Sequence, residues 1–222
     1  MNSMATQKTA ILFGATGLVG NHCLDLLLES PYYSKVKVFS RRSIGINHPK
    51  LEEYIIDFDK IEDSRSDISG HDVFCTLGTT MKKAGSKAEF IKIDYTYVLK
   101  TSKLAVENGA QQLLLVTALG ADESSMFFYN KVKGQIENSI QQLNFNSVRI
   151  FRPSLLLGNR KEKRLAEKLA IHTFGFLNLI TDIIAPKYSA IEARQVARAM
   201  VNTAQRTERG NFIYESDTIQ KL

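Results

Sequence analysis

Cysteine is scarce in this chain: Cys23 and Cys75 are the only two among 222 residues. Both lie within apolar sequence patterns, so we expect reduced core side chains and no disulfide. Residues 1–9 are polar and the apolar run that follows them is short, which gives no sign of a signal peptide. The sequence therefore predicts a cytoplasmic protein.

Long apolar runs, metal-ligand spacings and basic patches are missing as well. No stretch reaches the roughly 18 apolar residues of a transmembrane helix, so no membrane span is predicted. His22, His48, His71 and His172 are far apart and show no metal-ligand spacing, which predicts a protein without a metal site. The formal net charge is +6, but the basic residues are scattered and not interleaved with aromatic residues. A nucleic-acid partner is therefore not expected, and an anionic cofactor gives the charge a simpler use.

A glycine-rich turn near the amino end is the leading motif. The apolar run 10–13 is followed at once by Gly14, Gly17 and Gly20, and then by a helical pattern with one apolar face. In a dinucleotide-binding unit the first glycine permits a tight turn, the second lets a pyrophosphate approach, and the third lets the helix pack closely on the sheet. The free N–H groups at the helix start then bind the phosphates. The alternative is a purely structural turn.

The end of the second expected strand carries residues that select between cofactors. Ser40, Arg41 and Arg42 stand where dinucleotide-binding folds contact the 2′ position of the ribose. A carboxylate there favours NAD, and none is present. Two guanidinium groups and a hydroxyl suit a phosphate dianion, because arginine binds phosphate in a forked geometry. The motif predicts NADP(H), unless the two arginines merely solvate the strand end.

The next two strand ends offer further cofactor contacts. Asp57 and Phe58 follow the third expected strand, where the carboxylate would accept from the adenine amino group and the ring would pack on the base. The alternative there is a polar turn. Gly78 and Thr79 follow the fourth strand, expected over 73–77. A glycine and a hydroxyl fit the crevice at the carboxyl ends of the strands, where open α/β sheets bind ligands.

A tyrosine and a lysine follow the fifth expected strand at helical spacing. Tyr129 and Lys133 are four residues apart, so on a helix they share a face. The ammonium would lower the phenol pKa and hold the nicotinamide ribose, and the phenol would exchange a proton with a carbonyl or alcohol. The alternative is a surface pair on an amphipathic helix. Pro153 stiffens the end of the sixth strand, and that apolar edge would pack on the nicotinamide.

The order of these elements predicts the fold class. We expect an α/β fold: a doubly wound, mostly parallel Rossmann sheet with helices on both faces. Residues 1–222 would form a single NAD(P)-binding domain, with residues about 159–190 as a small substrate-side lobe. Strands are expected over 10–13, 36–40, 51–56, 73–77, 113–116, 147–151 and 212–214, helices over 90–108, 160–169 and 191–203, and a basic loop over 81–88.

Taken together, the motifs resemble one known group of proteins. The order Gly-x-x-Gly-x-x-Gly, Arg-Arg, Leu-Gly-Thr-Thr, Tyr-x-x-x-Lys and Arg-Pro-x-x-Leu-Leu-Gly is similar to that of the atypical short-chain dehydrogenase/reductase superfamily. Residues 75–80 and 119–125 resemble the branch of the Tat-interacting oxidoreductase and its bacterial relatives. The resemblance runs from about Ile11 to Thr203 and implies a Rossmann fold that binds NADPH. It also implies cofactor contacts at Thr16, Leu18, Val19, Asn21, Leu77, Leu156 and Arg164.

One departure from the superfamily bears on activity. The superfamily places a serine after the fifth strand to hold the substrate oxygen, and this chain has Thr117-Ala118 there. If Thr117 supplies the hydroxyl, the catalytic set is Thr117, Tyr129 and Lys133. The resemblance then implies a reductase that acts on a small carbonyl or alcohol as a monomer or homodimer. If Ala118 holds the needed position, the alternative is a non-catalytic NADPH-sensing protein that binds a protein partner.

Overall fold

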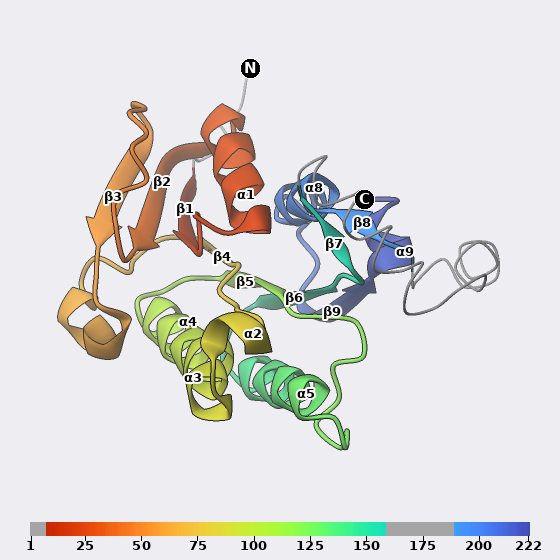
Figure 1. The fold of residues 1–222 in the computed structure, drawn as a ribbon. Coiled ribbons are helices and arrows are strands. Elements are labelled where there is room, and N and C mark those ends of the chain that lie inside the picture. The colour runs from red at the N-terminus through yellow and green to blue at the C-terminus, as the bar shows by residue number, and fades with distance from the viewer. Residues whose placement is uncertain (1–7, 159–188) are drawn as a thin grey trace.

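A computed structural model describes residues 8–158 and 189–222. Its centre is a seven-stranded sheet in the order β3-β2-β1-β4-β5-β6-β9 (Figure 1). All six pairings are parallel, which confirms the expected Rossmann-like sheet. The strands are β1 (Lys8–Phe13), β2 (Tyr33–Ser40), β3 (Leu51–Ile55), β4 (Asp72–Cys75), β5 (Gln112–Val116), β6 (Ser147–Arg152) and β9 (Gly210–Glu215).

Helices cover both faces of this sheet, so the doubly wound arrangement is confirmed (Figure 1). Leu12 of β1 points into a core with α1 and α8, whereas its neighbour Ile11 points into a second core with α4 and α5. That alternation is what a strand buried on both faces requires. The helices are α1 (Leu18–Glu29), η1 (Phe58–Ser64), α2 (Met81–Ala84), α3 (Lys87–Ile91), η2 (Lys92–Tyr97), α4 (Val98–Glu107), α5 (Phe128–Gln141), α8 (Ala193–Thr203) and α9 (Ser216–Ile219).

Helix α1, near the amino end of the chain, packs on helix α8, near its carboxyl end. They share one hydrophobic core, and the Cys23 sulfur lies 3.8 Å from the Met200 sulfur. Both cysteines of the chain are buried and free, as expected. Just before α8, a short parallel pair forms between β7 (Leu156–Leu157) and β8 (Ile191–Glu192). Of the helices in the described ranges, none is long and apolar enough to cross a bilayer.

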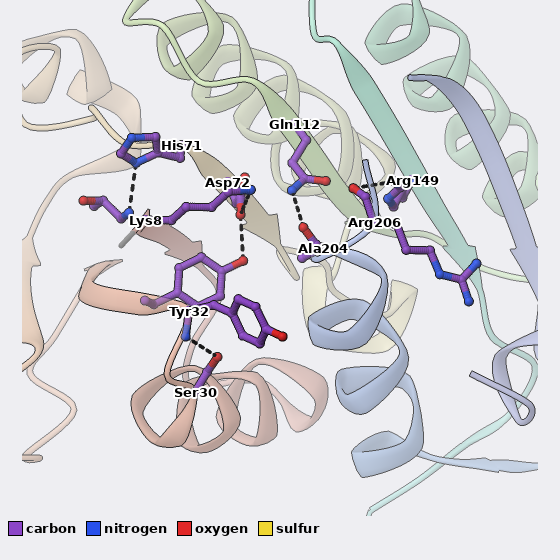
Figure 2. Close-up of polar contacts among 11 residues, drawn as sticks. Lys8, Ser30, Tyr32, His71, Asp72, Gln112, Arg149, Ala204 and Arg206 are labelled. Atoms are coloured by element: carbon purple, nitrogen blue, oxygen red, sulfur yellow. Dashed lines mark hydrogen bonds and ion pairs between the residues drawn. The ribbon is translucent and has the colours of Figure 1, made fainter. Parts of the chain in front are cut away.

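Polar side chains tie the amino-terminal edge of the sheet together (Figure 2). Asp72 accepts from the Lys8 ammonium at 3.1 Å and from the Tyr33 hydroxyl at 2.7 Å. Gln112, which stands opposite Asp72 on the next strand, donates to the backbone oxygen of Ala204 at 2.7 Å. These polar starts explain why several strands begin earlier than expected, since the prediction followed apolar runs alone.

The segment between β4 and α4 differs most from the prediction. The expected basic loop over 81–88 contains the short helix α2, because the Thr80 hydroxyl accepts from the Lys83 N–H and Gly85 closes the helix with a φ of +75°. The helix expected over 90–108 begins at Lys87, where Ser86 caps it. It then widens into a π-helical turn, η2, before continuing as α4. The expected lobe at about 159–190 and the helix at 160–169 fall almost wholly outside the described residues.

Candidate active site

The glycine turn lies between β1 and α1, at the carboxyl-terminal edge of the sheet. Gly14 has a φ of +89°, and an added Cβ there would lie 2.6 Å from the Thr76 hydroxyl oxygen. A Cβ on Gly20 would lie 2.1 Å from the Gly14 oxygen, so this glycine is required for close packing. A Cβ on Gly17 would lie 3.3 Å from the Gly14 oxygen, a tight contact but the least crowded of the three. Gly17 is the N-cap of α1 and supplies no side-chain cap, so no capping side chain occupies the first helical N–H groups.

Thr76 holds this turn in place, which the motif search missed. Its hydroxyl donates to the Phe13 oxygen at 2.9 Å, bridging the ends of β4 and β1. The strand expected over 73–77 ends at Cys75, and the backbone from Thr76 to Gly78 leaves the sheet. Because it leaves the sheet there, this backbone forms one wall of a groove.

The groove has a volume of about 700 Å³ and runs along the ends of β1, β2 and β4. Many of the predicted cofactor residues come together in it: Gly14, Thr16, Gly17, Ser40, Arg41, Arg42, Phe58, Leu77, Gly78 and Thr79. Residues that the prediction did not include also line it: Ala15, Phe39, Thr76, Lys83, Glu89, Ile93 and Tyr97. Leu18, Val19, Gly20, Asn21 and Asp57 lie beside the groove in sequence but are not among its lining residues.

The two arginines at the end of β2 present free guanidinium groups. Arg41 and Arg42 are exposed, and no carboxylate in the described part of the chain forms an ion pair with either. The Ser40 hydroxyl donates to the Arg42 backbone oxygen at 2.6 Å, so it closes the turn that carries them. Two unpaired cations on a groove wall are suited to an anionic group.

The predicted adenine contacts have structural partners of their own. The Asp57 carboxylate accepts from the Asp59 N–H at 2.9 Å and so caps η1. The Phe58 ring is buried, with its centroid 5.4 Å from that of Tyr97. Phe58 and Tyr97 thus form an aromatic part of the groove wall, while Asp57 shapes the turn beside it.

Tyr129 and Lys133 lie one turn apart on α5, and the lysine points inward. The Lys133 side chain is only 6% exposed, and its ammonium lies 6.0 Å from the Tyr129 ring centroid. A Cβ built on Gly78 would lie 3.6 Å from the same ammonium. The Tyr129 ring also packs on Phe90, at 5.4 Å between centroids. Lys133 therefore stands beside the groove and not in solvent.

A carboxylate that was not predicted holds this lysine. Asp94, in η2, is buried, and its Oδ1 lies 2.7 Å from the Lys133 ammonium. Its Oδ2 accepts from the Thr79 N–H at 2.8 Å. A sequence signal existed: Asp94 stands four residues from both Phe90 and Val98, which are core residues. A carboxylate between two buried positions needs a partner.

Thr117, Glu137 on α5 and Arg152 at the end of β6 form a second, largely buried network. The Thr117 hydroxyl donates to Glu137 Oε1 at 2.6 Å, and the Arg152 guanidinium donates to both Glu137 oxygens. The hydrogen bond to Glu137, more than any other influence, raises the pKa of Arg152. Pro153 is buried and its oxygen accepts from Leu119 N–H at 2.9 Å. Leu156 lies in β7, and Arg164 lies outside the described residues.

Comparison with known proteins places the chain in a family. Residues 14–168 match the NAD(P)H-binding family. The chain is 37% identical to the rat (Rattus norvegicus) protein HTATIP2 over 199 residues, 88% of this chain and 80% of that protein. It is 32% identical to a Candida albicans protein named FMP52, mitochondrial. That match extends over 214 residues, 92% of this chain and 91% of the relative.

Solved structures with low sequence identity share the fold. An ADP-L-glycero-D-manno-heptose-6-epimerase from Helicobacter pylori matches with a TM-score of 0.69 and 16% identity, over 97% of this chain and 79% of its own. A second match, with a TM-score of 0.68 and 11% identity, is a short-chain dehydrogenase/reductase superfamily protein from Agrobacterium tumefaciens, solved with bound NAD. It covers 95% of this chain and 78% of its own.

The names of the fungal relatives correct one expectation. The FMP52 proteins of Candida albicans and Meyerozyma guilliermondii are named mitochondrial, so the prediction of a cytoplasmic protein is wrong. Free buried cysteines indicate a reducing environment, which does not by itself distinguish one reducing compartment from another. The fold, the order of the motifs and the sequence identities all agree with the expected family. The chain belongs to the NAD(P)H-binding family and is a relative of HTATIP2, as its motifs predicted.

Proposed function

We propose that this protein is an NADP(H)-dependent reductase that acts on a small carbonyl compound, with Tyr129 as the proton donor. The observation that carries the proposal is the inward position of Lys133, whose buried ammonium lies 6.0 Å from the Tyr129 ring centroid and 3.6 Å from where a Cβ on Gly78 of the groove would be. A surface pair, the alternative reading of this motif, would leave the lysine exposed.

The groove fits a dinucleotide in its distribution of charge. At one end, the exposed Arg41 and Arg42 would hold a 2′-phosphate. In the middle, Gly17 leaves the uncapped start of α1 open to a pyrophosphate. At the other end, Gly78 borders the Tyr129–Lys133 pair. The chemistry that the bound cofactor supplies is hydride transfer to the carbonyl carbon.

The chain's own residues would complete the reaction by moving a proton. The Tyr129 hydroxyl would donate its proton to the carbonyl oxygen, which becomes the alcohol hydroxyl. The Lys133 ammonium would stabilise the phenolate that remains and hold the nicotinamide ribose. Hydride on carbon and proton on oxygen together balance the reduction.

A panel of aldehydes and ketones, assayed for NADPH oxidation, tests this function. We expect at least one small carbonyl compound to be reduced, with NADPH oxidation that depends on that compound. Tight NADPH binding with no turnover across the panel would favour the second candidate, a non-catalytic NADPH-sensing protein. The observation that favours the second candidate is that the Thr117 hydroxyl donates to Glu137, while Ala118 has no hydroxyl for a substrate oxygen.

The cofactor preference gives a separate prediction. Replacing Arg41 and Arg42 together by alanine should weaken NADPH binding about 10- to 100-fold and leave NADH binding nearly unchanged, because only the 2′-phosphate contact is lost. Calorimetric titration of both cofactors measures the effect. Arg206 and Arg209, exposed at the opposite edge of the sheet, provide a control double variant with the same charge change. Equal affinities for the two cofactors in the native protein would contradict the prediction.

A further inference from the structure

A second cavity lies at the edge of the sheet where the strands begin, opposite the groove that contains the proposed cofactor site. It has a volume of about 300 Å³ and lies between the turn that follows α1 and the turn that follows α8 (Figure 2). We call it the strand-start pocket. Its lining includes Lys8, Tyr32, Asp72, Gln112, Ser147 and the turn 205–209. The proposed reductase chemistry uses none of these residues.

A row of polar residues forms the floor of this pocket. Asp72, Gln112 and Ser147 stand in register on β4, β5 and β6. Each is at most 5% exposed, although a parallel sheet covered on both faces normally has apolar residues at such positions. Neighbouring strands lie about 4.8 Å apart, so one small molecule can reach Gln112 and Ser147 together.

The hydrogen bonds of this floor are incomplete. The Gln112 side-chain nitrogen donates to the Ala204 backbone oxygen at 2.7 Å, which fixes the orientation of the amide (Figure 2). The Gln112 side-chain oxygen and the Ser147 hydroxyl have no hydrogen-bond partner among the residues that the structure describes. Buried polar atoms without a partner are uncommon and costly, so both atoms need a group that completes them.

The walls of the strand-start pocket are held by other contacts. The buried Arg149 guanidinium lies 4.8 Å from the Phe212 ring centroid. It donates to the backbone oxygens of Arg206 and Glu208, each at 3.3 Å, which fixes the turn after α8. On the α1 side, Tyr32 is 49% exposed, so its ring presents an apolar face at the mouth. The pocket is thus formed before a ligand binds, which lowers the cost of binding.

The charges around the pocket favour an uncharged ligand. The Asp72 carboxylate accepts from the Lys8 ammonium and from the Tyr33 hydroxyl, so its charge is already balanced. The charged side chains of the turn 205–209 are exposed to solvent. A charged group at the floor would be buried without a counterion of its own, which costs far more than burying a neutral polar group.

We propose that the strand-start pocket binds a small uncharged molecule with neighbouring hydroxyl groups, such as a monosaccharide. A hydroxyl can donate to the Gln112 oxygen, and another can donate to or accept from Ser147. A carboxylate has no proton to give to the Gln112 oxygen. One sugar ring suits a cavity at the lower end of the size range of ligand pockets, and its C–H face would pack on the Tyr32 ring.

Titration followed by NMR tests this proposal. In ¹⁵N-labelled protein the Gln112 side-chain amide gives a pair of signals, which are the ones lost in Gln112→Met. D-glucose, D-galactose, D-mannose and D-ribose are the probes. At least one should shift this pair saturably, with a Kd of about 1 mM or below. The shift should persist with NADPH present, because the groove lies at the other edge of the sheet.

Variants and a charged sugar locate the contact. Ser147→Ala removes one hydroxyl and should weaken sugar binding about 5- to 10-fold, as should Gln112→Met, measured by calorimetry. Ser66→Ala, at an exposed position after η1, is the matched control and should leave the affinity unchanged. Glucuronate, which carries a carboxylate, should bind more weakly than the neutral sugar.

The outcomes do not depend on the proposed function. A saturable shift that either variant weakens supports the site, whether or not the protein reduces a carbonyl. No saturable shift of the Gln112 pair with any of these sugars overturns the proposal, and ordered water then completes the hydrogen bonds. An affinity unchanged in both variants, with circular dichroism showing them folded, also overturns it, because the sugar is then bound elsewhere. Tighter binding of glucuronate overturns the assignment of an uncharged ligand.

Discussion

Replacing Tyr129 by phenylalanine should lower the rate of carbonyl-dependent NADPH oxidation by about 10²- to 10⁴-fold, the usual contribution of a positioned proton donor. The substitution removes one hydroxyl and keeps the ring that packs on Phe90. Fold and groove should therefore be preserved, and the loss should fall on kcat more than on cofactor affinity. Steady-state kinetics, with calorimetric titration of NADPH on the same samples, measure both quantities.

A second tyrosine gives the control for this variant. Tyr54 stacks on Phe39, with 4.8 Å between ring centroids, and its hydroxyl donates to Glu52 away from the lining of the groove. Tyr54→Phe should therefore leave turnover within about twofold, because it keeps the stacked ring and removes only a hydroxyl that does not line the groove. Turnover that survives in Tyr129→Phe would remove the phenol from the mechanism.

Replacing Glu137 by alanine should lower the free energy of unfolding by about 3–5 kcal/mol, the usual cost of removing one partner of a buried ion pair. The Arg152 side chain is 20% exposed and donates to both Glu137 oxygens. The Thr117 hydroxyl donates to the same carboxylate. Alanine would leave the guanidinium and the hydroxyl without the acceptor that they share.

Urea unfolding followed by circular dichroism measures this loss. Gln135, exposed on the same helix, offers the control, and Gln135→Ala should change the free energy of unfolding by less than about 0.5 kcal/mol. Glu137→Gln keeps an acceptor for Thr117 and should lose less than Glu137→Ala. A loss below about 1 kcal/mol in Glu137→Ala would mean that water replaces the carboxylate, contrary to the burial of this network.

Much of the fold could be predicted because its signals are local. The run 10–13 followed by Gly14, and the strands of nearly continuous apolar residues, are typical of a parallel sheet covered on both faces. The polar strand starts were missed because Tyr33 and Asp72 stabilise each other, and neither belongs to an apolar run. Helix α2 was missed because it has no buried residues, so no apolar periodicity marks it.

The candidate site was also predicted only in part. Arg41, Arg42 and Gly78 follow directly from their places at strand ends, and the structure brings them into one groove. Asp94 was not predicted, because its role depends on a contact with Lys133 on another helix. The direction of the Thr117 hydroxyl could not be predicted either, since it depends on a hydrogen bond to Glu137.

The contact between α1 and α8 has a thermodynamic consequence. The uncapped start of α1 is the proposed phosphate site, and the body of α1 shares a core with the last long helix in the described residues. Binding at one end of α1 and the folding of α8 are therefore linked equilibria, and the coupling free energy is the same in both directions. A cofactor bound at the start of α1 would therefore stabilise the folded form of α8. Equally, any change that destabilised α8 would weaken cofactor binding by the same coupling free energy.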